Sequence, residues 1–292
     1  MIHIPVLQNE VIKYLDPKKN ENFIDCTLDG GGHTLKILEK TVPKGKLLGI
    51  EWDKEIISQV KFYEKKFKNR LILVNDTYAN LEKIVKAYNF KSVSGVLLDL
   101  GFSSWHLEKS GRGFTFLKNE PLDMRYNPDS SLTAEKILNY YSLQEIEKIL
   151  REYGEEKFSL EIAKNIVRFR QFAPIKKTSQ LVEIIKKSIP PKYQKINPAT
   201  RTFQALRIAV NDELKNLEKV LPQILNILKP KGRLVVISFH SLEDRIVKNF
   251  FKEKEKENII KILTKKPIIP RRDEVKINPR ARSAKLRAAL LI

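Results

Sequence analysis

The feature that most constrains the fold is a regular alternation, over the first hundred residues, between short apolar runs and longer amphipathic stretches. The apolar runs lie at 22–27, 46–51, 71–74 and 95–99, and the amphipathic stretches at 34–41, 54–67 and 78–88. Strands that alternate with helices in this way form parallel sheets. A further apolar run at 233–239, typical of a strand buried on both faces, predicts that the sheet continues there.

After the fourth predicted strand, apolar residues recur three and four positions apart, which is typical of helices. We expect helices at 133–138, 143–153, 159–169, 178–187 and 199–228. The sequence therefore predicts an α/β fold with two domains. Residues 1–106 and 201–292 form the sheet domain, and residues 107–200 form an inserted, mostly helical domain.

Charge is the first indication of a partner. The chain carries 55 Lys and Arg against 35 Asp and Glu, a net charge of +20. Of this excess, +8 falls within 151–210 and another +8 within 261–292. Uneven clustering of this kind is what binding to RNA or DNA requires, whereas solubility alone does not need it.

Composition also excludes several classes of protein. Cys26 is the only cysteine, so disulfide frameworks and metal sites of several thiolates are ruled out, and we expect no structural metal. The chain has no apolar run long enough to span a membrane, and its first residues lack the pattern of a secretion signal. A cytoplasmic protein without membrane contact is the expectation.

The strongest local signal is the motif DCTLDGGGH at 25–33, which follows the first predicted strand and opens a helix. Glycines here allow a tight turn and a close approach of a ligand to the backbone. Asp25 could receive an ammonium group, and Glu51, at the end of the second strand, is placed to bind two ribose hydroxyls. A nucleoside that also carries positive charge fits both carboxylates, so S-adenosylmethionine is the expected cofactor.

Asp99 ends the fourth predicted strand, at the edge where open α/β sheets bind ligands. Methylation of pyrimidine carbon 5 normally uses a cysteine nucleophile, but Cys26 lies at the first strand and is better explained as a buried apolar residue. Transfer to a nucleobase nitrogen needs only in-line geometry and an acceptor for the departing proton. Asp99 is the candidate acceptor.

Several long motifs, in order, resemble the bacterial 16S ribosomal RNA cytosine-N4 methyltransferase family, RsmH or MraW. Besides His3 to Leu7 and DCTLDGGGH, they are GVLLDLGFSSWHL at 95–107, RGFTF at 112–116, PLDMR at 121–125, YGEEKF at 153–158, ATRTFQALRIAVNDEL at 199–214, VVISFHSLEDRIVKNFF at 235–251 and NPRARSAKLRAA at 278–289.

The resemblance implies a Rossmann-like S-adenosylmethionine-dependent methyltransferase sheet with an inserted substrate domain. It also implies methylation of a decoding-centre cytidine at the exocyclic N4 amine, in 16S ribosomal RNA of the small subunit. By position, the cofactor contacts of the family fall on Gly31, Gly32, His33, Glu51, Tyr78, Asp99 and His106. Two residues depart from the family pattern: Asp29 stands where glycine is usual, and Glu51 where aspartate is usual.

Arginines and one histidine in the remaining motifs suit contacts with RNA, and three aromatic rings could stack on an extruded cytosine. The first set is Arg112, Arg125, Arg201, Arg207, His240, Arg245, Arg280 and Arg282, and the second is Phe114, Phe116 and Phe203. Two alternatives remain for these residues. Arg207 could pair with a structural acid, and the phenylalanines could belong to the core.

Two other functions remain as alternatives to an RNA methyltransferase. A nicotinamide-dependent dehydrogenase could use the same sheet, but Leu35 stands where its third glycine should be and it has no use for basic patches. An RNA-binding assembly factor with a vestigial pocket is supported only by Asp29. The sequence does not decide between a monomer and a homodimer, or between free RNA and an assembled subunit as substrate.

Overall fold

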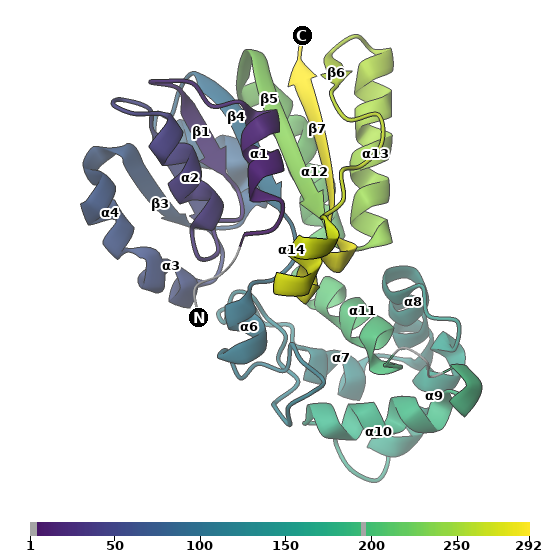
Figure 1. Ribbon diagram of the computed structural model, residues 1–292. Coiled ribbons are helices and arrows are strands. Elements are labelled where there is room, and N and C mark those ends of the chain that lie inside the picture. The colour runs from purple at the N-terminus through teal and green to yellow at the C-terminus, as the bar shows by residue number, and fades with distance from the viewer. Residues whose placement is uncertain (1–4, 194–196) are drawn as a thin grey trace. The chain divides into compact units, whose positions relative to one another are not determined.

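A computed structural model describes residues 5–193 and 197–292. The first two residues of the motif His3 to Leu7 lie outside these ranges. The chain divides into two compact units, Met1–Ser103 with Leu214–Ile292 and the inserted Ser104–Glu213. Figure 1 labels most of the elements of both units.

A seven-stranded sheet in the order β3-β2-β1-β4-β5-β7-β6 forms the centre of the first unit. Strands β1 to β5 run parallel, and β7 is antiparallel to both β5 and β6. The strands are β1 (Asn22–Asp25), β2 (Leu47–Glu51), β3 (Leu71–Asn75), β4 (Val93–Asp99), β5 (Leu228–Ser238), β6 (Ile260–Ile262) and β7 (Lys285–Leu291).

Helices cover both faces of this sheet because successive side chains of a strand point to opposite sides. Phe23 packs with one core cluster, which includes α1 and α2, and Ile24 packs with the other, which includes α5, α12 and α13. The same alternation runs along β4, where all seven residues are buried. The helices are α1 (Gln8–Leu15), α2 (Gly32–Lys40), α3 (Lys54–Val60), α4 (Phe62–Phe67), α5 (Leu81–Ala87), α12 (Glu213–Ile227), α13 (Ser241–Lys256) and α14 (Arg272–Ile277).

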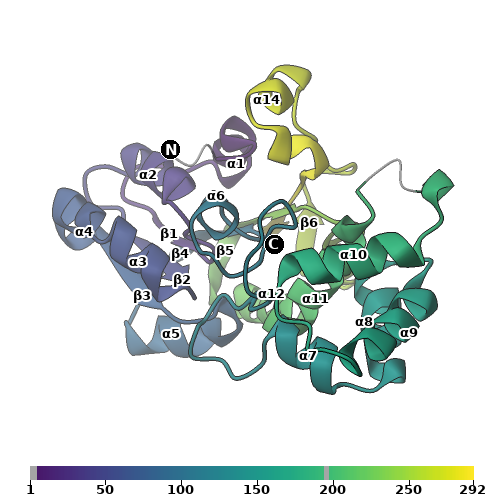
Figure 2. The ribbon, with the colours of Figure 1, turned by 90° about the horizontal axis from the view of Figure 1, so that it is seen from below.

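The second unit has a hydrophobic core of its own, formed by helices whose apolar residues face inward. Figure 2 shows these helices from below. They are α7 (Ala134–Tyr140), α8 (Leu143–Gly154), α9 (Ser159–Arg170), α10 (Thr178–Ser188) and α11 (Ala199–Asn211). The short helix α6 (Ser104–Glu108) begins the unit. No helix within residues 5–193 and 197–292 is both long enough and apolar enough to cross a membrane.

The inserted unit is larger than the predicted 107–200, because it begins at Ser104 and ends at Glu213. Helix α11 accounts for most of the difference: Phe203 and Leu206 are buried in the core of the inserted unit rather than against the sheet. The single helix predicted at 199–228 is therefore two helices. They are separated at Asp212, whose φ of 49° lies in the left-handed region and ends α11.

Three other elements differ from the prediction. The helix expected at 54–67 is divided into α3 and α4, and the one expected at 78–88 begins with a 3-10 turn, Tyr78–Asn80. Strand β5 starts at Leu228 instead of residue 233, since Leu228 already pairs with Val93 of β4. This early pairing brings Lys229–Gly232, expected as a connection, into the strand.

Candidate functional site

Carboxylates gather where strands β1, β2 and β4 end. Asp25, Glu51 and Asp99 are the last residues of these strands, and all three are buried. Parallel neighbours place their carboxyl ends at one edge of the sheet, so the three side chains are brought together as the sequence predicted. Burial raises the pKa of Asp25, and the nearby charge of Asp99 adds to this effect although Thr34 and His33 oppose it.

Glu51 is held in place by backbone amides. The N–H of Asp53 donates to its Oε1 at 2.8 Å and the N–H of Asp29 to its Oε2 at 3.1 Å. Burial nevertheless raises the pKa of Glu51 from 4.5 to about 7, because the amide donors only partly offset the loss of water. Since an ionised carboxylate has about four acceptor positions, room remains for hydroxyl donors from a ligand.

The glycine loop is shaped by two different requirements. Gly31 has a φ of 77°, which an L side chain rarely adopts, so glycine is needed for the backbone itself. Gly32 is needed for packing, since a Cβ there would come within 2.5 Å of the Pro5 ring. The backbone conformation and packing of the protein therefore require both glycines even without a ligand.

Asp29, which departs from the family pattern, also lies in the left-handed region, with a φ of 44°. Aspartate tolerates this conformation better than most residues, which explains how it can replace a glycine. Its carboxyl group adds a fourth acid to the cluster of Asp25, Glu51 and Asp99. Burial, and then the charges of Glu51 and Asp99, raise the pKa of Asp29 well above its ordinary value.

Asp99 and His33 face each other across the end of β4. The Oδ2 of Asp99 lies 3.4 Å from the Nε2 of His33, and both side chains are more than nine-tenths buried. Among the described residues, neither the Oδ1 of Asp99 nor the Nδ1 of His33 has a hydrogen-bond partner. Buried polar atoms without partners are costly, so these two atoms are suited to contact a ligand.

Three supporting residues were not predicted from the sequence. Thr27 accepts the N–H of Asp99 at 2.7 Å, and Thr34 donates its hydroxyl to Asp25 at 2.7 Å. Asn75 donates to the carbonyl of Glu51 at 2.8 Å and so joins the ends of β2 and β3. Their positions in the sequence could have indicated them. Thr27 follows strand β1, Asn75 ends strand β3, and Thr34 lies in the first turn of α2.

Cys26 is buried, and burial raises the pKa of its thiol well above the ordinary value. This agrees with the interpretation of Cys26 as an apolar core residue. A buried thiol with a raised pKa is a poor nucleophile.

Tyr78 begins the 3-10 turn after β3 and is half-buried against the core cluster that includes α5. His106 belongs to the other unit. Its ring lies within an aromatic group, with centroids 4.9 Å from Phe114 and 5.1 Å from Tyr126. The role of His106 at the cofactor stays a prediction.

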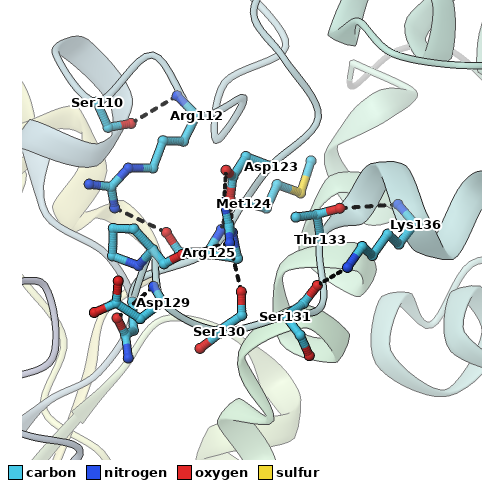
Figure 3. Close-up of polar contacts among 12 residues, drawn as sticks. Ser110, Arg112, Asp123, Met124, Arg125, Asp129, Ser130, Ser131, Thr133 and Lys136 are labelled. Atoms are coloured by element: carbon cyan, nitrogen blue, oxygen red, sulfur yellow. Dashed lines mark hydrogen bonds and ion pairs between the residues drawn. The ribbon is translucent and has the colours of Figure 1, made fainter.

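Arg112 and Arg125 form internal contacts, as Figure 3 shows. Arg112 is buried and donates to the carbonyls of Arg125 and Tyr126, and its guanidinium lies 5.2 Å from the Trp105 ring. Arg125 forms a two-point ion pair with Asp123 and also donates to the carbonyls of Pro128 and Ser130. Because these donors are already engaged, we assign both arginines a structural role in the loops of the inserted unit.

Arg207 pairs with a structural acid, which was the alternative to a contact with RNA. Its side chain is about 11% exposed and forms a two-point ion pair with Glu213, at 2.8 and 2.9 Å. The phenylalanines are core residues in the same way: Phe114 and Phe203 are buried, and Phe116 packs edge-on against Phe203.

The remaining predicted RNA contacts are more open. Arg245, Arg280 and Arg282 are exposed, and so is Arg201, although it donates to the carbonyl of Glu155. His240, at the start of α13, is the exception: its side chain is only 8% exposed, and its Nε2 lies 3.2 Å from the Oε1 of Glu243.

Comparison with known proteins agrees with this fold. A protein of Clostridium thermocellum described as an rRNA methylase has a crystal structure with a TM-score of 0.50 and 11% identity, covering 99% of this chain and 97% of that one. At this identity the likeness concerns the fold alone. The predicted Rossmann-like methyltransferase fold is confirmed.

The sheet unit thus has a methyltransferase-type fold. The chain matches the MraW methylase family over residues 1–291 and belongs to that family. It is 47% identical to the ribosomal RNA small subunit methyltransferase H of Clostridium botulinum strain Kyoto, over 98% of this chain and 97% of the relative. The protein of that name from Thermosipho melanesiensis is also 47% identical, with the same coverage.

The raised pKa of Glu51 predicts a pH-dependent affinity for adenosine-containing ligands. The ionised carboxylate accepts from two ribose hydroxyls more strongly than the neutral acid does, so affinity should rise as the pH increases through about 7. Titration calorimetry with S-adenosylhomocysteine, from about one pH unit below this value to about one above, measures the effect.

Two variants serve as controls for this prediction. Glu51→Gln should bind at least about tenfold more weakly and lose the pH dependence. Asp29→Asn keeps a residue that tolerates the positive φ and, because the raised pKa of Asp29 favours its uncharged form, should leave the pH profile close to that of the wild type. An unchanged pH profile in Glu51→Gln would assign the dependence to another group.

Proposed function

We propose that this protein transfers a methyl group from S-adenosylmethionine to the exocyclic N4 amine of a decoding-centre cytidine in 16S ribosomal RNA. Membership of the MraW methylase family and the names of its relatives support the reaction class and the substrate. The observation that carries the proposal is the set of buried carboxylates at the strand ends, with Asp99 partly unpartnered among them. Small ribosomal subunits are cytoplasmic in bacteria, where we expect the protein to act.

The cofactor assignment is supported by the electrostatics of the cluster. Several carboxylates with raised pKa values share one edge of the sheet, and a positive charge placed among them would stabilise their ionised forms. S-adenosylmethionine supplies an electrophilic methyl group on a positively charged sulfur. We assign Glu51 to the ribose, Tyr78 to the adenine, and Gly31, Gly32, His33 and Asp99 to the methionine portion.

The protein's own part in the reaction is to position the amine and remove a proton. As the nitrogen of the substrate amine bonds to the methyl carbon, the carbon–sulfur bond breaks and the nitrogen gives up one hydrogen as a proton. We assign the carboxylate of Asp99 as the acceptor, because its Oδ1 is free to take a hydrogen bond while Oδ2 lies beside His33. The backbone N–H of Asp99 is fixed by Thr27, which holds the residue at the strand end.

The direct test is a methyl-transfer assay with labelled S-adenosylmethionine and small ribosomal subunits that lack the modification. Nucleoside analysis should yield N4-methylcytidine at a single site. Free 16S ribosomal RNA, assayed in parallel, distinguishes the two forms of substrate. Binding of the cofactor without transfer to either substrate would favour the assembly-factor alternative.

Asp99→Ala and Asp99→Asn should each lower kcat by a factor of about 10² to 10⁴, the usual contribution of a positioned proton acceptor. RNA affinity should remain close to that of the wild type, because phosphate contacts elsewhere on the protein dominate binding to RNA. Glu39→Gln, which removes an exposed carboxylate from α2, is the matched control. Wild-type turnover in both Asp99 variants would reject the assignment.

Arg280 and Arg282 should contribute to RNA affinity through phosphate contacts. They flank Ala281, which is fully buried, so the 3-10 helix Pro279–Ser283 presents both exposed side chains from a fixed backbone. Replacing both with Gln should weaken RNA binding and lower the slope of log K against log salt by about 1 to 2.

The matched control for this pair replaces two exposed lysines of the sheet unit, Lys40 and Lys44, with Gln. The control removes the same net charge at a different place. Equal losses of affinity and slope in both double variants would show that only the total charge matters.

A further inference from the structure

Two aromatic side chains of the inserted unit are unusually exposed. Tyr140, at the end of α7, is 81% exposed, and Phe172, just after α9, is 84% exposed. They are the most exposed aromatic residues in the described parts of the chain. A single exposed ring is ordinary, whereas two rings held at one place on a surface require an explanation.

Hydrogen bonds join the two segments that carry these rings. Asn139, next to Tyr140, donates to the carbonyl of Ile175 and accepts its N–H, both at 2.9 Å. Arg170 donates to the carbonyl of Leu138 at 2.8 Å, which attaches the end of α9 to the end of α7. Since Ile175 is fully buried, the connection that carries Phe172 is fixed to α7, and both rings are presented from an ordered backbone.

The surroundings of the rings are positively charged. Residues 164–192 contain eight Lys and Arg but only one acid, Glu183. Arg168 lies one helical turn before Phe172, and Lys176 and Lys177 follow in the same connection. All three are exposed, and among the described residues none of them forms an ion pair.

We propose that Tyr140, Phe172, Arg168, Lys176 and Lys177 form a surface that binds single-stranded RNA, with bases stacked on the rings and phosphates on the cations. This inference rests on the proposed function. It identifies a part of the contact with the RNA substrate that the proposed function does not assign. Aromatic rings beside a basic surface are the combination with which proteins bind single strands without reading sequence. A second copy of the chain would bring another +20 of charge, so charge complementarity favours RNA over self-association.

The experiment measures binding of a fluorescein-labelled single-stranded RNA of mixed sequence to the full chain. Phe172→Ala and Tyr140→Ala should each weaken binding by about fivefold to a hundredfold, the usual loss of one stacking partner. Phe172→Trp should keep the affinity, whereas Phe172→Leu should lose it, because leucine is apolar but has no flat ring. Tyr88→Ala, which removes an exposed ring from the sheet unit, should have no effect.

The cations are tested separately by replacing Lys176 and Lys177 with Gln. Loss of two phosphate contacts to a single strand should lower the salt slope by about 1.4. An unchanged slope and affinity would overturn the electrostatic part of the proposal.

Three further outcomes would overturn the stacking part. The first is wild-type RNA affinity in Phe172→Ala, and the second is equal RNA affinity in Phe172→Leu and Phe172→Trp. The third is a change in the oligomeric state of Phe172→Ala, measured by sedimentation, without a change in its RNA affinity. The last would identify the surface as a contact between copies of the chain. Methyl transfer by the wild type is assayed in parallel. If the wild type transfers no methyl group, the proposed function fails, whereas unchanged RNA binding in the variants shows that only this surface is wrong.

Discussion

Burial of the sheet on both faces is the constraint on which the rest of the structure depends. Along β4 every side chain is buried, and alternate residues of β1, β2, β4 and β5 supply two separate hydrophobic clusters. Strands β1, β2 and β4 carry a charged side chain only at their carboxyl ends. Function is therefore concentrated at one edge, where the last residues of β1, β2 and β4 are all carboxylates.

Ionisation of the carboxyl groups at this edge is unfavourable, and a bound cationic ligand would make it more favourable. Asp25, Asp29 and Glu51 have raised pKa values, because burial and mutual repulsion disfavour their ionised forms. Protein groups compensate in part through the amides that hold Glu51 and the hydroxyl that Thr34 gives to Asp25. The remaining imbalance explains why a charged nucleoside suits this edge better than a dinucleotide phosphate, which would add negative charge.

The inserted unit uses its arginines in two ways. Arg112, Arg125 and Arg207 are engaged with carbonyls or carboxylates and brace the unit from within. Other cations remain exposed and are available to a polyanion. Residue type alone cannot separate the two groups, because guanidinium groups bind phosphates and carboxylates by the same two-point geometry.

Much of this protein could be predicted from the sequence. The alternation of apolar and amphipathic segments determined the parallel sheet and the position of the insertion, and the strand ends located Glu51 and Asp99, since both signals depend on local spacing. The tertiary structure alone decided the partners of Arg207 and Arg112, the break at Asp212 and the membership of α11 in the inserted core. These features depend on which surfaces meet across long stretches of chain, and local periodicity contains no information about that.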